Sequence, residues 1–500
     1  MKKKELLSVT LALGLALSFA GCAGKSTPPP KTEPAQPTTQ ATPKTPASQP
    51  ADVDKMMEQG IKYIETGDYA NAIKTYQEIL TATDNKDTKA MAYYNLACTY
   101  SLMKEKAPAL EYLEKSIKNG YDNRESIEND KDLDFLRAMP EYKTIIDSIP
   151  LIQEIQPTPE DEKSQQEALK LIEQYRGIKY KSEPKYKIMA PDQFQRAYGG
   201  NAKSILGFYR WDDKTLYLQQ GLDPVKSKGV RIHETFHAIQ DQLFNTGATQ
   251  KSAKTTDDYY TIKAVIEGDA TLTFIECMPD SRAGMMIKSS KPWRAMGKGE
   301  PLYDNSESGE AAMRMRFLDY SLAALFIKAI KDAKGWEGVN AIYTHMPAST
   351  EQVLHPEKYI QQNDPPIAVT IPDLSAIIGT EWKVFQPDVQ GEFAILLNLL
   401  TNPKSGPLAE EASAGWGGDS FIRIGNPTTR QLFTIHKTVW DTPKDAKEFL
   451  DAAKLTLERG IQPGNKMDYI TLLNDLTVLV IRDIPQDLSE KVVKAISDGK

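Results

Sequence analysis

The chain has 500 residues, of which 26% are charged, and a formal net charge of −7 at pH 7. It contains no basic run interleaved with aromatic residues, which argues against a nucleic-acid-binding protein. It also contains neither a Gly-rich phosphate loop nor a Gly-x-Ser-x-Gly motif, which argues against P-loop NTPases and α/β-hydrolase esterases.

Residues 1–21 are predicted to be a targeting segment. Positions 2–4 are Lys, and residues 6–19 form an apolar stretch that is short for a membrane span. The segment ends in Phe-Ala-Gly-Cys, which resembles a bacterial lipobox. This resemblance implies that Cys22 is lipidated after cleavage and anchors the protein to a bacterial membrane. We expect an extracytoplasmic location, at the outer membrane or cell surface.

Residues 22–52 are predicted to be a disordered tether. They are rich in Pro, Thr, Gln and Ser and have almost no large apolar side chains. Such a segment buries too little surface to offset its chain entropy. It would hold a folded domain away from the membrane.

Residues 53–150 are predicted to form helical hairpins that repeat. Similar residue types recur at an offset of 37 residues: Gly60, Tyr63, Ala72, Tyr76 and Leu80 are followed by Ala97, Tyr100, Ala109, Leu113 and Ile117. Small residues flanked by bulky ones at this spacing resemble tetratricopeptide repeats. The resemblance implies a module that binds a peptide or a protein partner. A spacer without a binding role is the alternative.

The elements predicted after residue 152 include more helices than strands. Residues 152–184 read as a linker and a first helix, and residues 203–219 as two strands around a turn at 211–214. A core helix is expected within 317–333. A buried strand at 476–482 and a closing helix at 487–498 complete the prediction. The expected fold class is therefore α+β, mainly helical.

The segment 231–241 carries the most specific motif of the sequence, His-Glu-x-x-His. On a helix, His233 and His237 face the same side, where two imidazoles can bind one metal ion. Glu234 lies about 100° around the helix, where it can reach a metal-bound water. The chain has only 5 His, so a chance match is improbable. An amphipathic helix with ordinary His residues is the alternative.

An acidic pair thirty residues beyond His237 supplies a candidate third ligand. Glu267 and Asp269 lie in the otherwise apolar helical stretch 259–278. A buried carboxylate is costly unless it is paired or bound to a metal. We therefore expect Glu267 to complete a His, His, Glu site for Zn²⁺ with one position open to water. A local cap or ion pair is the alternative. We expect Asp269 to orient a zinc-bound His.

The two motifs, His-Glu-Thr-Phe-His-Ala-Ile-Gln-Asp-Gln and Ala-Val-Ile-Glu-Gly-Asp-Ala-Thr, together resemble secreted bacterial metallopeptidases of the zincin type whose third ligand is Glu. Segments 205–218, 347–359 and 414–419 extend the resemblance toward the C-terminus. It implies a zincin-like metallopeptidase domain over residues 158–500. The Asn-Glu-x-x-Ser-Asp context of thermolysin-like enzymes is absent, which leaves open which carboxylate orients the ligands.

The predicted mechanism uses Glu234 as the general base that takes a proton from water. A strand at 204–209 or its partner is expected to align an extended peptide by backbone hydrogen bonds. A donor for the oxyanion is sought among His355, Tyr359 and Tyr260. His355 is selected because it lies in a Pro-bounded, loop-like segment, with a structural hydrogen bond as the alternative.

The predicted function is hydrolysis of peptide bonds in extracytoplasmic protein or peptide substrates by a membrane-tethered zinc enzyme. One alternative is a non-catalytic lipoprotein that binds or assembles partners through its repeats. A zinc amidase acting on cell-wall peptides is another. Cys98 and Cys277 are expected to be buried free thiols rather than a disulfide.

Overall fold

The computed structural model is mainly helical, with 61% helix and 15% strand, as the α+β prediction required. It describes residues 53–121, 124–149, 154–198, 205–281, 322–361, 364–400, 402, 404–426, 429, 431–457 and 466–498. The predicted leader, the lipidation site Cys22 and the tether lie outside the described residues.

The chain forms two compact units. Of the described residues, those within 1–155, 188–206 and 219–222 belong to the first unit, and those within 156–187, 207–218 and 223–500 belong to the second. The second unit begins close to the predicted start of the metallopeptidase domain at 158. Two short stretches that were predicted to belong to this domain, 188–206 and 219–222, group instead with the first unit.

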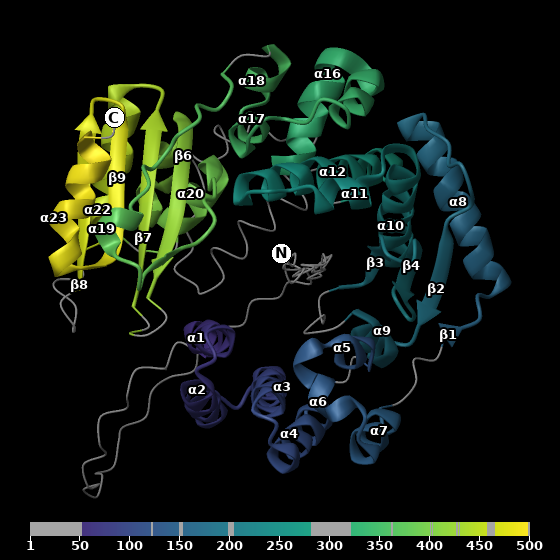
Figure 1. The fold of residues 1–500 in the computed structure, drawn as a ribbon. Helices are drawn as coiled ribbons and strands as arrows, with labels where there is room; N and C mark the ends of the chain where they lie inside the picture. Colours follow the sequence, from purple (N-terminus) through teal and green to yellow (C-terminus); the bar gives the residue numbers. More distant parts are fainter. Residues whose placement is uncertain are drawn as a thin grey trace, which may run out of the picture. The chain divides into compact units, whose positions relative to one another are not determined.

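The first unit consists of short helices that pack in consecutive pairs, α1 with α2 and α3 with α4 (Figure 1). Its elements are α1 (Val53–Glu65), α2 (Tyr69–Ala82), α3 (Lys86–Leu102), α4 (Lys106–Lys118), α5 (Arg124–Asn129), η1 (Lys131–Leu133), α6 (Asp134–Arg137), α7 (Pro140–Asp147), β1 (Glu154–Ile155) and α9 (Pro191–Tyr198). Asp68 and Asn85 cap the N-termini of α2 and α3 through their side chains. The predicted helical hairpins are thus present.

The residues of the 37-residue repeat lie where helices of the first unit meet. Ala72 and Tyr76 are fully buried, as are Ala97 and Leu113 of the second copy. A Cβ at Gly60 would lie 2.5 Å from the Tyr76 ring, so only glycine lets α1 approach α2 this closely.

The second unit contains the remaining elements. They are α8 (Pro159–Arg176), β2 (Lys185–Met189), β3 (Gly207–Arg210), β4 (Thr215–Gln219), α10 (Pro224–Phe244), α11 (Thr246–Lys251), α12 (Thr256–Cys277), α16 (Leu322–Ile342), α17 (Thr350–Leu354), α18 (Pro356–Gln361), α19 (Ser375–Ile378), β5 (Lys383–Val384), α20 (Gly391–Leu400), η3 (Gly406–Leu408), α21 (Ala409–Ser413), β6 (Trp416–Gly425), β7 (Leu432–Trp440), α22 (Pro443–Thr456), β8 (Lys466–Asn474), β9 (Thr477–Pro485) and α23 (Gln486–Asp498).

In the second unit, β2, β4 and β3 lie side by side in this order and precede α10. β3 and β4 form the predicted hairpin, with Gly207 opposite Leu218 and Arg210 opposite Thr215. Lys214 in the turn adopts a positive φ of 54°. Among the described strands, β3 is the outermost on its side of the sheet.

Helices α8, α10, α12 and α16 share one apolar core. Ile232 and Phe236 of α10 pack there with Val265 of α12 and Phe326 of α16. The described part of the predicted core helix 317–333 is the start of α16, and Gly335, with φ 66° and ψ −174°, interrupts that helix. Burying these faces against one another holds α10 and α12 side by side, where the candidate site forms.

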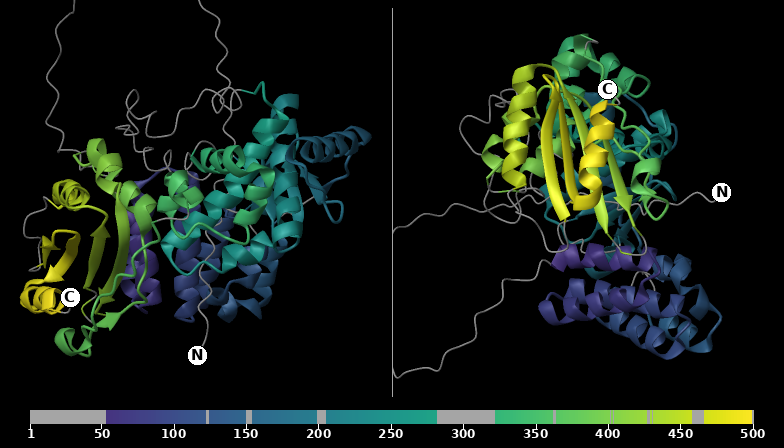
Figure 2. Two further views of the ribbon diagram at one scale, coloured as in Figure 1. Left: turned by 90° about the horizontal axis from the view of Figure 1, so that it is seen from above. Right: turned by 60° about the vertical axis from the view of Figure 1, so that its left-hand side comes forward.

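A five-stranded antiparallel sheet of order β5-β6-β7-β9-β8 follows. Side chains alternate between its faces: Val478 and Val480 share a cluster with Phe449 of α22, whereas Leu479 and Ile481 join the cluster that includes α23. Helices α22 and α23 therefore cover opposite faces (Figure 2). β9 and α23 agree with the predicted buried strand and closing helix.

One further sequence prediction concerns the cysteines. Cys98 and Cys277 are buried free thiols, as expected. Among the described helices, none has the length and apolar character needed to cross a membrane.

Asp257, in the first turn of α12, is buried and accepts hydrogen bonds from the backbone and the hydroxyl of Thr350. Burial raises the pKa of this carboxyl to about 7, and the nearby Asp419 charge adds to the shift against the lowering effect of Thr350. Between the ordinary Asp value of about 4 and about 7, the folded chain holds a proton that the unfolded chain has released. The contribution of Asp257 to stability therefore falls as pH rises through this window.

We expect Asp257→Asn to remove this dependence, because one amide oxygen can accept both Thr350 bonds. Urea unfolding at several pH values should show wild type losing up to about 1.4 kcal/mol per pH unit, between about pH 4 and 7, relative to the variant. The exposed Asp212→Asn serves as a control and should keep the wild-type slope. Identical slopes for wild type and Asp257→Asn would contradict the assignment.

Candidate metal centre

The two motif histidines lie on α10, which is longer than the motif requires. Asp223 caps the helix by accepting from the Lys226 amide, Pro224 occupies its first turn, and Asn245 ends it in a left-handed conformation. His233 and His237 are both buried, with 1% and 4% of their surface exposed. The helix therefore presents both imidazoles to the protein interior.

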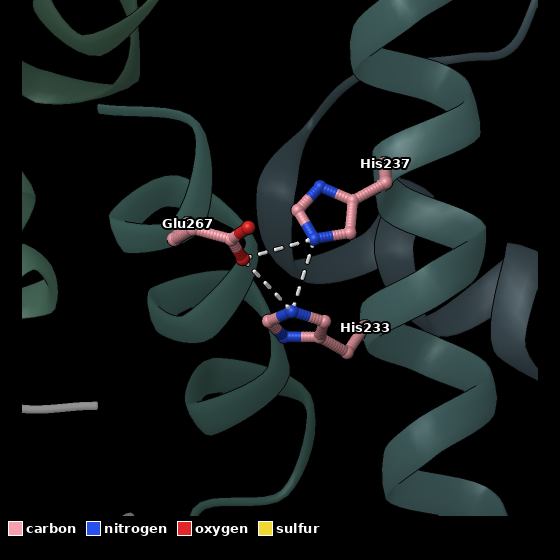
Figure 3. Close-up of side chains that lie close together, drawn as sticks. All are labelled: His233, His237 and Glu267. Carbon is pink, nitrogen blue, oxygen red and sulfur yellow. Dashed lines mark hydrogen bonds and ion pairs between the residues drawn. The ribbon is translucent and has the colours of Figure 1, made fainter. Parts of the chain in front are cut away.

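The predicted third ligand lies on α12, which begins with a capping box formed by Thr255 and Asp258. Glu267 Oε2 lies 3.5 Å from His233 Nε2 and 3.2 Å from His237 Nε2. The two Nε2 atoms are 3.0 Å apart. The two imidazoles and the carboxylate point toward one common position (Figure 3).

The size and chemistry of this triangle fit a zinc ion. A tetrahedral zinc with bonds of about 2.0–2.1 Å separates its ligand atoms by about 3.3–3.4 Å, close to the three distances observed. Among the described residues, no donor makes a well-formed hydrogen bond to the buried Glu267 Oε2. A buried carboxylate oxygen without a hydrogen bond is costly unless a cation faces it. Lys263 Nζ lies 3.8 Å from the other oxygen, Oε1, whereas Oε2 faces the two imidazoles. His233, His237 and Glu267 are thus able to hold a divalent cation.

The charges of His237 and Glu267 shift each other's pKa. Burial acts to lower the pKa of His237, but the Glu267 carboxylate outweighs it and raises the value to about 9. Burial acts to raise the pKa of Glu267, but its two His neighbours outweigh burial and hold this pKa well below the usual range. A proton on His237 thus compensates the carboxylate, and a zinc ion bound at this position would displace that proton.

Glu234 lies beside the triangle, on the side of β3. Burial raises the pKa of its carboxyl, which the His233 and His237 charges oppose and the Glu267 charge supports. The backbone amide of Tyr209 donates a hydrogen bond to Glu234. A Cβ at Gly207 would lie 3.0 Å from Glu234 Cγ and 2.4 Å from Val230, so glycine lets β3 approach α10. A carboxyl with a raised pKa is suited to proton transfer near neutral pH.

Gly268, next to Glu267, sets the distance between α12 and α16. A Cβ at this position would lie 2.5 Å from the backbone oxygen of Ala323. Because backbone cannot rotate away as a side chain can, Gly268→Ala should push the helices apart. We expect a loss of about 1–3 kcal/mol in the free energy of unfolding, measured by urea denaturation. Unchanged stability would show that α12 and α16 are less closely packed than described.

The structure corrects the role expected for Asp269. Its carboxylate does not contact a histidine directly: it accepts two hydrogen bonds from Arg176, at 2.9 and 3.1 Å, and one from Tyr343, at 2.9 Å. The group that meets His237 is Gln240, whose Oε1 lies 2.8 Å from Nδ1. The sequence holds a signal for Gln240, because it lies three residues after His237 on the same helix. No local signal points to Arg176 or Tyr343.

The three candidates for the oxyanion donor have other contacts. His355 is buried, and its Nε2 lies 3.0 Å from Glu392 Oε2 on α20. Tyr359 donates to the backbone oxygen of His345 at 2.7 Å, and Tyr260 packs edge-on against Phe393. None of the three belongs to the metal-ligand cluster, so a catalytic role of His355 stays a prediction.

A second acidic cluster is formed by Glu351, Asp364 and Asp441. Lys358 Nζ lies 2.7 Å from Glu351 and 3.1 Å from Asp441, and it also pairs with Asp364. An ammonium group therefore supplies the positive charge that these carboxylates need. The cluster reads as a structural ion pair network rather than a metal site.

Asp419, in the predicted signature 414–419, stabilises the start of α20. Its carboxylate accepts from the backbone amides of Gln390 and Gly391, both at 2.9 Å, and from Trp416 Nε1 at 3.0 Å. These contacts give Asp419 a structural role at this turn of the chain.

Comparisons with known proteins cover only parts of the chain. Residues 58–145 match a domain of unknown function, DUF6340, and residues 383–478 match a second domain of unknown function, DUF8575. Both segments lie outside α10 and α12, which carry the candidate site. The chain is also 28% identical over 98 residues, 20% of its length, to a chloroplastic protein of Arabidopsis thaliana. It spans 29% of that relative. No solved structure matches the chain.

Proposed function

We propose that the protein is a zinc-dependent peptidase whose second unit has a zincin-like architecture. The observation that carries the proposal is the convergence of His233 Nε2, His237 Nε2 and Glu267 Oε2 within 3.0–3.5 Å, beside a buried Glu234. His-Glu-x-x-His with a distant Glu is a ligand set used by hydrolytic zinc sites.

His233, His237 and Glu267 would hold the ion. Bound zinc would supply a water of lowered pKa and polarise the carbonyl of the scissile bond. Glu234 would accept a proton from the attacking water on its carboxylate and then deliver it to the leaving amine. The hydrogen bond from the Tyr209 amide would restrain the Glu234 carboxylate during both transfers.

The outermost position of β3 supports an extended peptide as substrate. β3 contacts α10, and no described strand lies on its outer side. Backbone hydrogen bonds from such an edge align a peptide regardless of its side chains. Substrates would therefore be protein or peptide segments in extended form.

The N-terminal segment would anchor the protein to a membrane, and the helical first unit would bind a protein partner. The helical pairs of the first unit support a tetratricopeptide-like module for a protein partner. The Lys-rich start, apolar stretch and Cys22 support a lipid-anchored protein outside the cytoplasm.

Metal analysis and substrate screening test the proposal. Protein purified without chelators should contain about one zinc per chain, and it should cleave members of a mixed peptide library until a chelator is added. Parallel assays with peptidoglycan fragments distinguish a cell-wall amidase. A chain that binds zinc but cleaves neither class would support a non-catalytic binding factor instead.

A further inference from the structure

A row of buried polar groups leads away from the far side of His237. Its Nδ1, which points away from Glu267 (Figure 3), lies 2.8 Å from Gln240 Oε1. Gln240 Nε2 in turn donates to the backbone oxygen of Ile266 at 3.0 Å and to the Tyr343 hydroxyl at 2.6 Å. Gln240 is fully buried, so each of these bonds replaces one to water.

The row ends at a buried ion pair on other helices. The Tyr343 hydroxyl, just beyond α16, donates to Asp269 Oδ2 at 2.9 Å. Arg176, the last residue of α8, donates to both oxygens of Asp269, and both side chains are fully buried. Arg176 also donates to Asn340 at 2.7 Å. Four segments of the chain thus meet behind one imidazole.

The proton positions along this row follow from the donors and acceptors. Arg176 can only donate, and ionised Asp269 can only accept. Tyr343 therefore uses its single proton toward Asp269 and can only accept from Gln240.

The Ile266 carbonyl also can only accept a hydrogen bond. The NH₂ group of the Gln240 amide must therefore face both the Ile266 carbonyl and the Tyr343 hydroxyl. The amide oxygen must then face His237. Because an amide oxygen can only accept, Nδ1 of His237 must carry a proton, and the lone pair of the neutral ring lies on Nε2.

We propose that Gln240 is a positioning residue that holds His237 with Nδ1 protonated and Nε2 directed at the metal, with its own orientation set by the row Arg176–Asp269–Tyr343. The inference rests on the proposed function, because it assigns this row to the zinc site. The Gln240 amide also donates to the backbone oxygen of Ile266, the residue before Glu267. It therefore links α10 to α12 beside His237 and beside Glu267. Because the Gln240 amide is neutral, it orients His237 without adding a negative charge to the site.

Zinc dissociation tests the inference. Zinc-loaded wild type, Gln240→Met and Tyr343→Phe are mixed with excess chelator, and the rate of zinc loss is followed. Gln240→Met keeps the length of the side chain but removes its hydrogen bonds, so we expect zinc loss about 10–100-fold faster. Tyr343→Phe should change the rate in the same direction by less, because Gln240 keeps its bond to Ile266.

Gln242→Met is the matched control, because Gln242 lies on the same helix and makes amide hydrogen bonds to Lys181 and Ser182, away from the site. It should lose zinc at the wild-type rate. Equal rates for Gln240→Met and Gln242→Met, in chains with wild-type circular dichroism, would overturn the inference.

A measurement on the unaltered protein covers the case in which Gln240→Met does not fold. With only 5 His in the chain, ¹⁵N-histidine labelling gives a readable spectrum of the zinc-loaded protein. We expect His237 to be protonated at Nδ1, and an unprotonated Nδ1 would overturn the inference. Wild type that takes up no zinc would overturn the proposed function and the row's assigned role together. Wild type that takes up zinc but fails either test above would overturn the inference alone.

Discussion

Glu234→Gln should abolish most peptide hydrolysis while the protein keeps its zinc. The amide has nearly the same shape as the carboxylate, but it cannot accept the proton of the attacking water. General-base catalysis contributes about 10²–10⁴-fold to a rate, and we expect a loss of this size in kcat/KM. Initial rates on a library substrate, together with zinc content, would measure both effects.

Glu234→Asp provides the matched comparison, because it keeps the base and shortens its reach by one methylene. It should retain more activity than Glu234→Gln. Hydrolysis by Glu234→Gln at the wild-type rate would remove Glu234 from the mechanism. Zinc loss from this variant would instead show that Glu234 helps to hold the ion.

Glu267→Gln should release zinc and, with it, the activity. The substitution keeps the volume of the side chain but removes the negative charge 3.2 Å from His237 Nε2. Structural zinc binding of about 10–16 kcal/mol, shared equally among four ligands, gives each about 2.5–4 kcal/mol. We therefore expect the zinc affinity to fall about 10²–10³-fold, measured by competition with a calibrated chelator.

Glu276→Gln on the same helix is the control for this experiment. Glu276 pairs with Lys331, away from the histidines, so its loss should leave zinc affinity unchanged. If Glu267→Gln bound zinc as tightly as Glu276→Gln, another acid would have to be the third ligand.

The site was largely predictable because helical spacing is a local property. His233 and His237 must share a helix face, and Glu267 stands out because it belongs to an acidic pair with apolar residues on either side. Their convergence agrees with the structure. The repeated small residues likewise predicted helix pairs, since Gly60 is required where Tyr76 packs.

The misassigned role of Asp269 has a long-range cause. Arg176 lies 93 residues earlier in the chain and makes a bidentate ion pair with Asp269, so this carboxylate is already satisfied before any histidine is considered. For the same reason the pairing of His355 with Glu392, 37 residues later, was invisible from its loop-like surroundings.

The sequence alone predicted the two histidines and the acid that converge, Glu234 beside them and the mainly helical class, because periodicity and residue chemistry act over a few residues. Only the tertiary structure decided which groups stand behind His237 and what faces each buried charge. A hydrogen bond acts over about 3 Å and requires an oriented donor. The packing of α8, α10, α12 and α16 against one another brings such partners together. Because the partners lie far apart in the sequence, no local sequence pattern predicts their contact.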